Sequence, residues 1–506
     1  MRIAFISLFK EGGGGGEGRV AHEMAWHFAA EHDTVLICPG DDTRLHRGKN
    51  GLRILSLKSA GEGDFRIAAT TTKQVSRVFD FFDSFEPEVV HAHEPLSLGL
   101  IGQVWAKMHH VPFVHTAHVL PSKMFQFGAT EAIAVLQNPV GEMIAKQSLS
   151  NFLTNFYDNC DAIIALNRFA AQDIRESTDC DSIFSIPNGR DLSTYSRCNH
   201  ARVSDEKKVL TFIGFISERK NQRYLAEVLL HLGPEYKLQL VGRSLARKYT
   251  QQLREFAQQH RLDVEFIGAV EHHDIPAYLE KAHILTSASR MEVQSLVVIE
   301  ALASGTPVVG LSNETIDELV NQEVGCRLSR DAEPEAFARC VKTICSLPQE
   351  EYDRLCENAR ARVMGHDWAR VITQTIAIYE ELQRREPPSA ENSMLRMEKA
   401  LSLIPRGEVK VFLDRRIAQL RRTLRRTSHP TESRFASRIR EARRVPNSTW
   451  ILFALTIPLS WVIYQIAKHV PILSRPEDER EDGPDRDRRP KWLRWFSDVG
   501  GVDADV

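Results

Sequence analysis

Apolar residues recur in two alternating patterns along this chain of 506 residues. Short continuous apolar runs are typical of buried parallel strands, and apolar residues at every third or fourth position predict amphipathic helices. The runs predict strands at residues 3–9, 34–38, 88–92, 111–115, 161–165, 209–214, 237–241, 264–267 and 308–309, and the helical spacing predicts helices at 20–30, 97–109, 295–303 and 368–384. Strands that alternate with helices indicate an α/β protein with parallel sheets.

The stretch at residues 286–310, TSASRMEVQSLVVIEALASGTPVVG, organises the rest of the chain. It predicts a strand end, a polar loop, a helix, a tight turn and a next strand. The helix start near Leu296 and Val297 leaves backbone N–H groups unpaired at the positive end of the helix dipole, where an anion is stabilised. A diphosphate placed there would have Glu292 on one side, able to accept from sugar hydroxyls, and Glu300 within the helix, able to accept from a ribose diol. The pattern therefore predicts a nucleotide-sugar site.

An E-x7-E pattern followed by A-x-A-x-G-x-P-V-V stands here as Glu292, Glu300, Ala301, Ala303, Gly305, Pro307, Val308 and Val309. It resembles the donor-site motif of the retaining family-4 glycosyltransferases. These enzymes have the GT-B fold, two Rossmann-like domains that face each other across a cleft. The resemblance covers about residues 1–385. The family's Gly-Phe-Gly after the first glutamate is replaced by Val293, Gln294 and Ser295, which changes the expected sugar contacts.

The same resemblance implies roles for residues elsewhere in the chain. In H-T-A-H, His118 matches a histidine that lies beside the anomeric carbon of the donor. The segment GFISERKN at 214–221 is similar to a G-R-x4-K motif that neutralises the donor diphosphate, so Lys220 matches the lysine. Phe215 stands at the position of the arginine, and Arg219 is the candidate for the second charge, because a guanidinium can bind phosphate oxygens bidentately.

Several backbone positions complete the expected donor site. The glycine run at 12–16 would face the diphosphate from the first domain, with Gly15 and Gly16 closest. Gly268 and Val270 would frame the nucleotide base, and Ser295, Leu296 and Val297 form the helix start. The segment IPNGRD at 186–191 is similar to the family's P-N-G-V-D turn near the hinge.

The resemblance implies transfer of a sugar from a nucleotide diphosphate sugar with retention at the anomeric carbon. It implies neither a cofactor nor a metal, because the metal-binding Asp-x-Asp of the other large glycosyltransferase fold is not part of this family's motif. The leaving diphosphate, stabilised by Lys220, Arg219, the helix start near Val297 and the glycine run, would act as the base for the acceptor hydroxyl.

Other interpretations stay open at this point. Gly13, Gly15 and Gly18 satisfy G-x-G-x-x-G, a pattern that dinucleotide-binding oxidoreductases also carry. The acceptor could be a polysaccharide or another soluble molecule rather than a lipid. Phe215 and Val293 also allow a catalytically inactive, membrane-tethered interaction protein. Histidines 91, 93, 115 and 118 suggest a metal site, but strand-end histidines are more often structural and no carboxylate or cysteine completes the set.

Composition adds two expectations. The net charge of −2 says little about partners, and we expect no nucleic acid. The eight cysteines show no C-x-x-C pair, and thiols such as Cys38 and Cys326 stand in or beside apolar runs, so we expect reduced, buried cysteines in a reducing compartment. The N-terminus leads directly into a strand and glycine turn and shows no cleavable targeting peptide.

The chain changes character after residue 385. Basic residues greatly outnumber acidic ones over 406–444, on a helix that suits either nucleic acid or anionic lipid. Residues 450–467 are uncharged and strongly apolar and are close to the length of a bilayer span, which favours lipid, although Pro458 keeps an interfacial helix open. KWLRWF at 491–496 is a short aromatic and basic patch. The apolar segment 120–155 would either admit a lipid acceptor or cap the sheet. We expect the cytoplasmic face of a membrane as the location.

The predicted organisation is α/β, with two Rossmann-like domains and a C-terminal helical membrane-associating extension. Its parts are an acceptor domain at 1–200, a nucleotide-sugar donor domain at 201–367, a helix crossing back to the first domain at 368–385, a basic helical extension at 386–448, a membrane helix at 449–468 and a charged tail at 469–506. The expected partners are a nucleotide sugar and a membrane lipid, and the sequence leaves the oligomeric state open.

Overall fold

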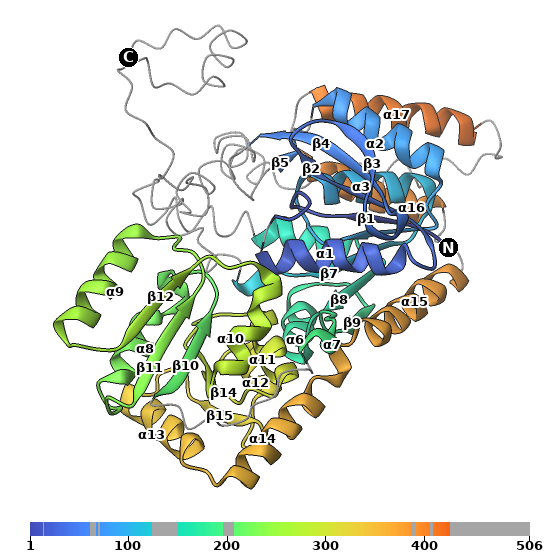
Figure 1. Ribbon diagram of the computed structural model, residues 1–506. Helices are drawn as coiled ribbons and strands as arrows, with labels where there is room; N and C mark the ends of the chain where they lie inside the picture. Colours follow the sequence, from blue (N-terminus) through green and yellow to red (C-terminus); the bar gives the residue numbers. More distant parts are fainter. Residues whose placement is uncertain are drawn as a thin grey trace, which may run out of the picture. The chain divides into compact units, whose positions relative to one another are not determined.

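The computed structural model describes residues 1–13, 15–60, 67–68, 71–123, 150–195, 207–385, 390–404 and 408–425. The predicted membrane helix at 450–467, the patch at 491–496 and most of the apolar segment at 120–155 lie outside the described residues. We call the described residues up to 195 the N-lobe and residues 207–366 the C-lobe (Figure 1).

The N-lobe contains the first parallel sheet, which has nine strands in the described part of the chain. The strand order is β3-β4-β2-β1-β6-β7-β8-β9, and β5 pairs with β4. All pairs are parallel except those of β3 and β5 with β4. The strands are β1 (Arg2–Ile6), β2 (Asp33–Gly40), β3 (Arg44–Arg47), β4 (Arg53–Ala60), β5 (Ile67–Ala68), β6 (Val89–Ala92), β7 (Phe113–Ala117), β8 (Ala162–Ala165) and β9 (Ile183–Ser185).

The C-lobe contains a six-stranded sheet with the order β12-β11-β10-β13-β14-β15, parallel throughout its described pairs. Its strands are β10 (Lys208–Ile213), β11 (Tyr236–Val241), β12 (Val264–Gly268), β13 (Ile284–Ser287), β14 (Val308–Leu311) and β15 (Gly325–Leu328). The two parallel sheets confirm the predicted pair of Rossmann-like units.

Helices cover both sheets (Figure 1). The N-lobe helices are α1 (Gly15–Phe28), α2 (Thr72–Phe85), α3 (Ser97–His109), α6 (Arg168–Ser177) and α7 (Leu192–Tyr195), with the 3-10 turn η1 (Lys49–Gly51). The C-lobe contains η4 (Glu218–Lys220), α8 (Gln222–Leu229), α9 (Arg247–Gln259), η5 (His272–Asp274), α10 (Ile275–Lys281), α11 (Leu296–Ser304), α12 (Glu314–Leu319), α13 (Pro334–Cys345), α14 (Gln349–Arg362) and η6 (Met364–His366). The chain continues through α15 (Trp368–Arg384), α16 (Ala390–Ser402) and α17 (Glu408–Arg425).

Each sheet reverses its strand order at one point, and the candidate residues follow the strands beside that point. In the N-lobe the reversal lies between β1 and β6, which lead into the glycine run and into His93. In the C-lobe it lies between β10 and β13, which lead into Lys220 and Glu292. In open α/β sheets, ligands bind beyond the carboxyl ends of the strands at this reversal. The topology therefore places the predicted groups where a ligand site is expected.

The described part of the basic extension forms the helices α16 and α17, and their apolar side is covered by the N-lobe. The helices α16 and α17 lie beside α3 and α2 (Figure 1). The buried side chains of the two helices and of Ile404, just after α16, join the N-lobe core. The helix residues are Met397, Ala400, Leu401, Leu413 and Ile417. Arg396 lies 2.5 Å from Asp161, and Arg416 pairs with Asp80 and Asp83. The described part of the extension is thus a component of the N-lobe. Within the described residues, no helix combines the length and hydropathy of a bilayer span.

One cysteine prediction is wrong. Cys326 on β15 and Cys340 on α13 form a disulfide, with their Cα atoms 6.2 Å apart. The pattern of single cysteines did not show that a strand and a helix fourteen residues apart in sequence would place these two thiols face to face. The free cysteines among the described residues, including Cys38, are buried as predicted.

The docking of α17 makes a prediction about stability. Leu413 is 0% exposed in the N-lobe core, whereas Val411 on the same helix is 48% exposed. We expect Leu413→Ala to lower the free energy of unfolding by roughly 2–5 kcal/mol, because it leaves a cavity in the core, and Val411→Ala to change it by less than about 0.5 kcal/mol. Chemical denaturation of both variants checks this. Equal, small losses would show that α17 does not pack on the N-lobe.

Candidate functional site

A buried ion pair lies beyond β10 and β13. The Nζ of Lys220 contacts Oε1 of Glu292, and only 15% and 11% of the two side chains are exposed. Arg219 lies farther away, with NH1 3.8 Å from the same oxygen, and it donates to the carbonyl of Met291 at 3.1 Å. Burial acts to raise the pKa of Glu292, but the positive charges of Lys220 and Arg219 outweigh it and hold this pKa below its ordinary value. The structure thus brings together three predicted residues, with Lys220 as the closer cation.

The second predicted carboxylate, Glu300 on α11, is also buried, and a cation balances its charge. Its Oε1 lies 3.2 Å from Nε of Arg190 and 3.0 Å from Nε2 of His272. Burial acts to raise the pKa of Glu300, but the hydrogen bond from His272 and the charge of Arg190 lower it below its ordinary value. Arg190 also donates to Glu23 on α1 at 2.8 Å. Glu300 is therefore ionised in a site with few exposed atoms.

Sequence analysis missed Arg190, His272 and Glu23. Arg190 is the arginine of IPNGRD, and the sequence held one signal of its role, a charged residue at the apolar position of the P-N-G-V-D pattern. Glu23 lies on α1, and His272 lies in η5 beyond β12. Nothing in the local sequence of Glu23 and His272 distinguishes them from solvent-exposed charges, because only the tertiary fold brings them to Arg190 and Glu300.

Two helix starts lie next to each other at this place. A Cβ added to Gly16 on α1 would lie 2.9 Å from Cδ1 of Leu296, the first residue of α11. The predicted glycine loop is corrected here, since α1 begins at Gly15 and both Gly15 and Gly16 belong to its first turn. The N–H of Ser295 donates to the hydroxyl of Thr315 at 2.8 Å, so the N–H groups of Leu296 and Val297 are the first of α11 that point out of the helix. Both helix dipoles favour an anion between them.

The residues that replace Gly-Phe-Gly connect the two lobes. Gln294 donates to the carbonyl of Leu166 at 2.6 Å and accepts from the N–H of Asn188 at 2.7 Å. The carbonyl of Val293 accepts from Asn167 at 2.5 Å, and its side chain is buried in the N-lobe core. These side chains hold the loop that carries Glu292 against the N-lobe.

His118 follows β7 and is paired with His93, with Nε2 and Nδ1 3.0 Å apart. Burial lowers the pKa of His118 to about 3, so the imidazole is neutral at physiological pH. His91 lies 2.5 Å from the hydroxyl of Tyr379 and 2.7 Å from that of Thr116, which marks it as a structural group. Among the residues that the structure describes, no group of three histidine, cysteine, aspartate or glutamate side chains is placed to hold a metal ion.

The remaining predicted positions lie at the ends of C-lobe strands. Gly268 ends β12 with a φ of +86°, where a side chain would be strained, and Val270 is half-buried in the loop that leads to His272. Phe215 has a cation beside its ring, the guanidinium of Arg243 at 5.1 Å, which was not predicted from the sequence.

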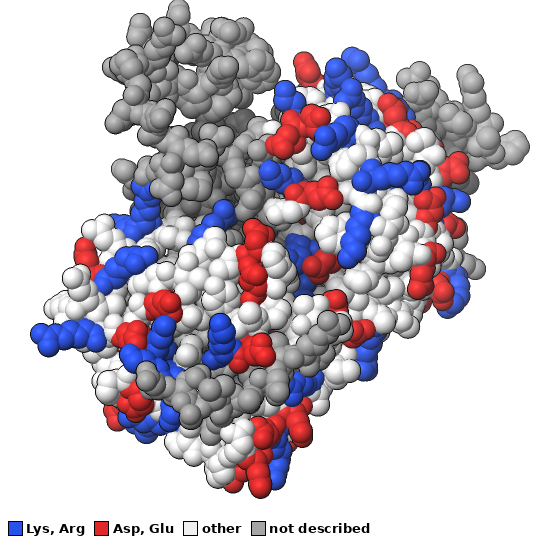
Figure 2. All heavy atoms as spheres, in the orientation of Figure 1, with Lys and Arg blue, Asp and Glu red and all other residues white. Residues whose placement is uncertain are grey.

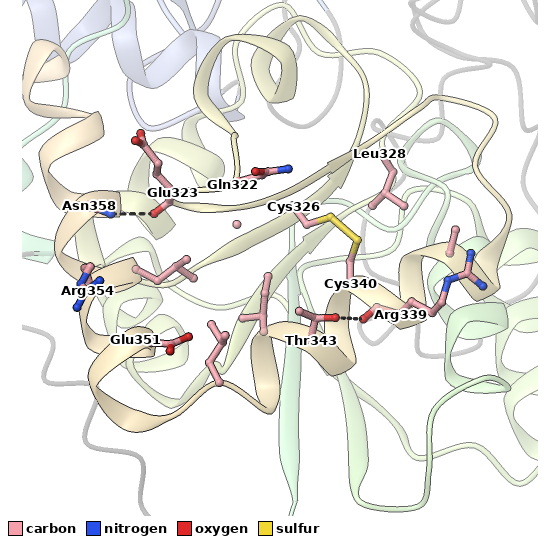
Figure 3. A pocket seen from close by; sticks show the side chains of 15 residues that line it. Gln322, Glu323, Cys326, Leu328, Arg339, Cys340, Thr343, Glu351, Arg354 and Asn358 are labelled. Atoms are coloured by element: carbon pink, nitrogen blue, oxygen red, sulfur yellow. Dashed lines mark hydrogen bonds between the residues drawn. A yellow bond between two sulfur atoms is a disulfide. The ribbon is translucent and has the colours of Figure 1, made fainter.

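A separate hollow of about 730 Å³ lies on the C-lobe between β15, α13 and α14 (Figure 3). The disulfide of Cys326 and Cys340 and the side chains of Thr343 and Asn358 line it, and it includes none of the candidate residues. On the face shown in Figure 2, basic and acidic side chains are interspersed over both lobes. The candidate site is therefore defined by its buried charges and helix starts rather than by this hollow.

Comparison with known families divides the chain at the same place as the two sheets. The family described as Glycosyltransferase Family 4 matches residues 14–194, and the family described as Glycosyl transferases group 1 matches residues 199–362. The second match contains Lys220, Glu292 and Glu300, and the first contains the glycines and His118.

Two curated relatives and one solved structure illustrate the similarity. The GDP-mannose-dependent alpha-(1-6)-phosphatidylinositol dimannoside mannosyltransferase of Mycobacterium tuberculosis is 23% identical over 74% of this chain and 95% of its own length. The glycogen synthase of the same species is 24% identical over 74% of this chain and 92% of its own. The structure of HepE from Anabaena in complex with UDP and glucose has a TM-score of 0.59 at 18% identity and covers 75% of this chain and 100% of HepE. This likeness shows the GT-B fold.

The ion pair of Lys220 and Glu292 makes a prediction about pH. In the wild type the pKa of Glu292 is lowered, so its ionised form contributes stability at neutral pH that is lost as the pH falls through the folded-state pKa. Lys220→Met leaves this carboxylate buried without its closest cation. The pKa of Glu292 should then rise above its value in the unfolded chain, so the variant is least stable at high pH.

We expect Lys220→Met to lower the free energy of unfolding by roughly 3–5 kcal/mol at about pH 8 and by clearly less at about pH 5. Denaturation at both pH values measures this difference. In the Glu292→Gln background the same substitution should show no such pH dependence. A loss that is equal at both pH values in the wild-type background would contradict the account of the pair.

Proposed function

Because the chain belongs to the family 4 glycosyltransferases with a group 1 domain, we propose that it transfers a sugar from a nucleotide diphosphate sugar to a hydroxyl group of a membrane lipid, with retention at the anomeric carbon. The observation that supports this most is the pair of buried, compensated carboxylates, Glu292 against Lys220 in the loop before α11 and Glu300 within α11. The cation and the helix start suit the diphosphate of such a donor. The two ionised carboxylates suit its sugar hydroxyls and its ribose diol.

In this proposal each group has one task at the donor. Lys220 and the N–H groups of Leu296 and Val297 bind the diphosphate, and the first turn of α1 approaches it from the N-lobe. Lys220 must then shift its contact from Glu292 toward phosphate, which leaves Glu292 able to accept from a sugar hydroxyl. Glu300 accepts from the ribose. His118 is neutral and therefore hydrogen-bonds near the anomeric carbon without adding charge.

The reaction follows from these contacts. The bond between the anomeric carbon and the diphosphate oxygen breaks while the acceptor oxygen approaches from the same face. The departing diphosphate takes the proton of the acceptor hydroxyl, and Lys220 and the helix starts stabilise the negative charge that develops on it. Arg219, at the edge of the ion pair, would supply a second positive charge. We expect no cofactor and no strict metal requirement, because these groups supply the positive charge a leaving diphosphate needs.

The lipid acceptor is supported by the relatives and by the C-terminal sequence. The mycobacterial mannosyltransferase is named for a phosphatidylinositol dimannoside. The basic segment and the apolar residues 450–467 are suited to the cytoplasmic face of an anionic membrane, where each basic residue near the surface contributes about 1 kcal/mol. A glycan acceptor is the second candidate, because the glycogen synthase is as similar and covers as much of the chain.

The donor assignment predicts the effect of neutral variants. Glu292→Gln and Glu300→Gln should each cost on the order of 1.5–3 kcal/mol in transfer, a reduction of roughly ten- to hundred-fold, because an amide keeps the shape but loses charge-assisted hydrogen bonds to hydroxyls. The rate of nucleoside diphosphate release from several nucleotide sugars measures this. Glu381→Gln, on the exposed side of α15, is a matched control that should keep the wild-type rate. Wild-type rates in both site variants would exclude this donor site.

The membrane assignment predicts a result for truncation. A chain that ends at Arg425 keeps the packed helices α16 and α17 and should fold, whereas one that ends at Arg385 exposes the core contacts of Leu413 and Ile417. We expect the chain ending at Arg425 to release nucleoside diphosphate normally with a soluble acceptor but to bind anionic vesicles weakly. Co-sedimentation of full-length and truncated protein with vesicles at low and high salt measures this. Equal sedimentation of both would remove the support for membrane binding through residues 426–506.

A further inference from the structure

Arg190 lies in a turn that both lobes hold in place. Its backbone N–H donates to the carbonyl of His366 at 2.7 Å, and the N–H of Asn188 donates to Gln294 at 2.7 Å. A Cβ at Gly189 would lie 2.2 Å from the ring of Trp368, so the turn packs directly on the start of α15. The backbone from which the Arg190 side chain extends is therefore fixed.

The side chain of Arg190 joins two carboxylates from different lobes. It is 2% exposed, its NH1 donates to Glu23 of α1 at 2.8 Å, and its Nε lies 3.2 Å from Glu300 of α11. A planar guanidinium can bind two carboxylates in fixed directions, which an ammonium group cannot do. The NH1 end of the side chain is thus hydrogen-bonded to Glu23, while Nε faces Glu300 in an ion pair without a hydrogen bond.

The groups around Glu300 come from four further elements. They are Arg19 and Glu23 on α1, Arg190 in the turn, Tyr195 on α7 and His272 in η5. Tyr195 lies 3.0 Å from His272, which lies 3.0 Å from Glu300. Of these neighbours, Arg190 is the cation in direct contact with the carboxylate.

We propose that Arg190 is a positioning residue for the nucleotide: anchored by Glu23, it holds the Glu300 carboxylate in the orientation and the ionised form that receive the ribose diol. This inference rests on the proposed function, because it assigns the ribose to Glu300. Arg190 itself does not touch the donor in this account. It acts on the affinity for the nucleotide only through Glu300.

A purely structural role would give a different pattern of results. If Arg190 only joined the lobes, its loss would weaken nucleotide binding equally at every pH and independently of residue 300. If it acts through Glu300, its loss leaves a buried carboxylate whose pKa rises, so that the ribose contact weakens as the pH falls. That difference makes the proposal testable with the full-length protein.

The experiment titrates UDP and GDP separately into the wild type, Arg190→Gln, Arg190→Lys, Glu300→Gln and the double variant Arg190→Gln/Glu300→Gln, at about pH 6 and about pH 8.5. Each affinity is divided by that of the wild type at the same pH, which cancels the titration of the diphosphate itself. Arg384→Gln, which removes a 73% exposed arginine side chain on α15, is the control for loss of an arginine. Melting curves of each variant establish that it is folded.

We expect Arg190→Gln to bind about tenfold more weakly than the wild type at pH 6, and to approach the wild type at pH 8.5. Arg190→Lys keeps the charge but not the planar fork, so it should bind more weakly than the wild type by the same factor at both pH values. The double variant should bind no more weakly than Glu300→Gln. The proposal would be overturned if Arg190→Gln lost the same affinity at both pH values. It would also be overturned if the double variant bound more weakly than Glu300→Gln by the whole factor that Arg190→Gln loses alone.

Three further outcomes are also informative. If Arg190→Gln does not fold, Glu23→Gln takes its place in the test, because it frees the other end of the arginine. This variant should no longer change the nucleotide affinity in the Glu300→Gln background. If the wild type binds no nucleoside diphosphate, ADP and dTDP included, the proposed function fails together with this inference. A third outcome is that the wild type binds, Glu300→Gln binds weakly, and Arg190→Gln has the wild-type affinity at both pH values. The proposed function then stands, and only the role of Arg190 is overturned.

Discussion

The site depends on the compensation of two buried carboxylates. Glu292 and Glu300 are both removed from water, and an ionised carboxylate in such a place is stable only beside a cation with good geometry. Lys220 compensates Glu292 from within the C-lobe, whereas Arg190 compensates Glu300 from a turn of the N-lobe. The protein thus holds two ionised carboxylates ready. When the diphosphate of a donor takes over the contact of Lys220, Arg219 and a sugar hydroxyl must serve as the partners of Glu292.

Several interlobe contacts of this chain are made by residues that depart from the family pattern. Gln294 and Val293 hold the donor loop against Leu166 and Asn167, and Arg190 spans from Glu23 to Glu300. When the sequence was considered alone, the replacement of Gly-Phe-Gly indicated changed sugar contacts, and Val293 together with Phe215 allowed an inactive protein. In the structure they have a physical role, since they connect the loop and helix that carry the two carboxylates to the N-lobe.

The sequence predicted those parts of the fold that depend on local pattern. The helices Ser97–His109 and Trp368–Arg384 match their predicted bounds, and the predicted central strands are present, because buried runs and amphipathic spacing are local signals. The strand β4 and helix α2 were missed. The grouping of Lys220 with Glu292 could be predicted because a motif fixes their positions. The partners Arg190 and His272, the docking of α17 on α2 and the disulfide could not, since each joins segments whose encounter only the tertiary fold decides.

The most direct test of the account is a crystal structure of the protein with UDP or GDP bound. The account predicts that the diphosphate lies within hydrogen-bond distance of Lys220 and of the N–H groups of Leu296 and Val297, with the ribose hydroxyls on Glu300. It also predicts that Arg190 keeps its contacts with Glu23 and Glu300. A nucleotide bound elsewhere, for example in the hollow beside Cys326 and Cys340, or with its ribose away from Glu300, would contradict it.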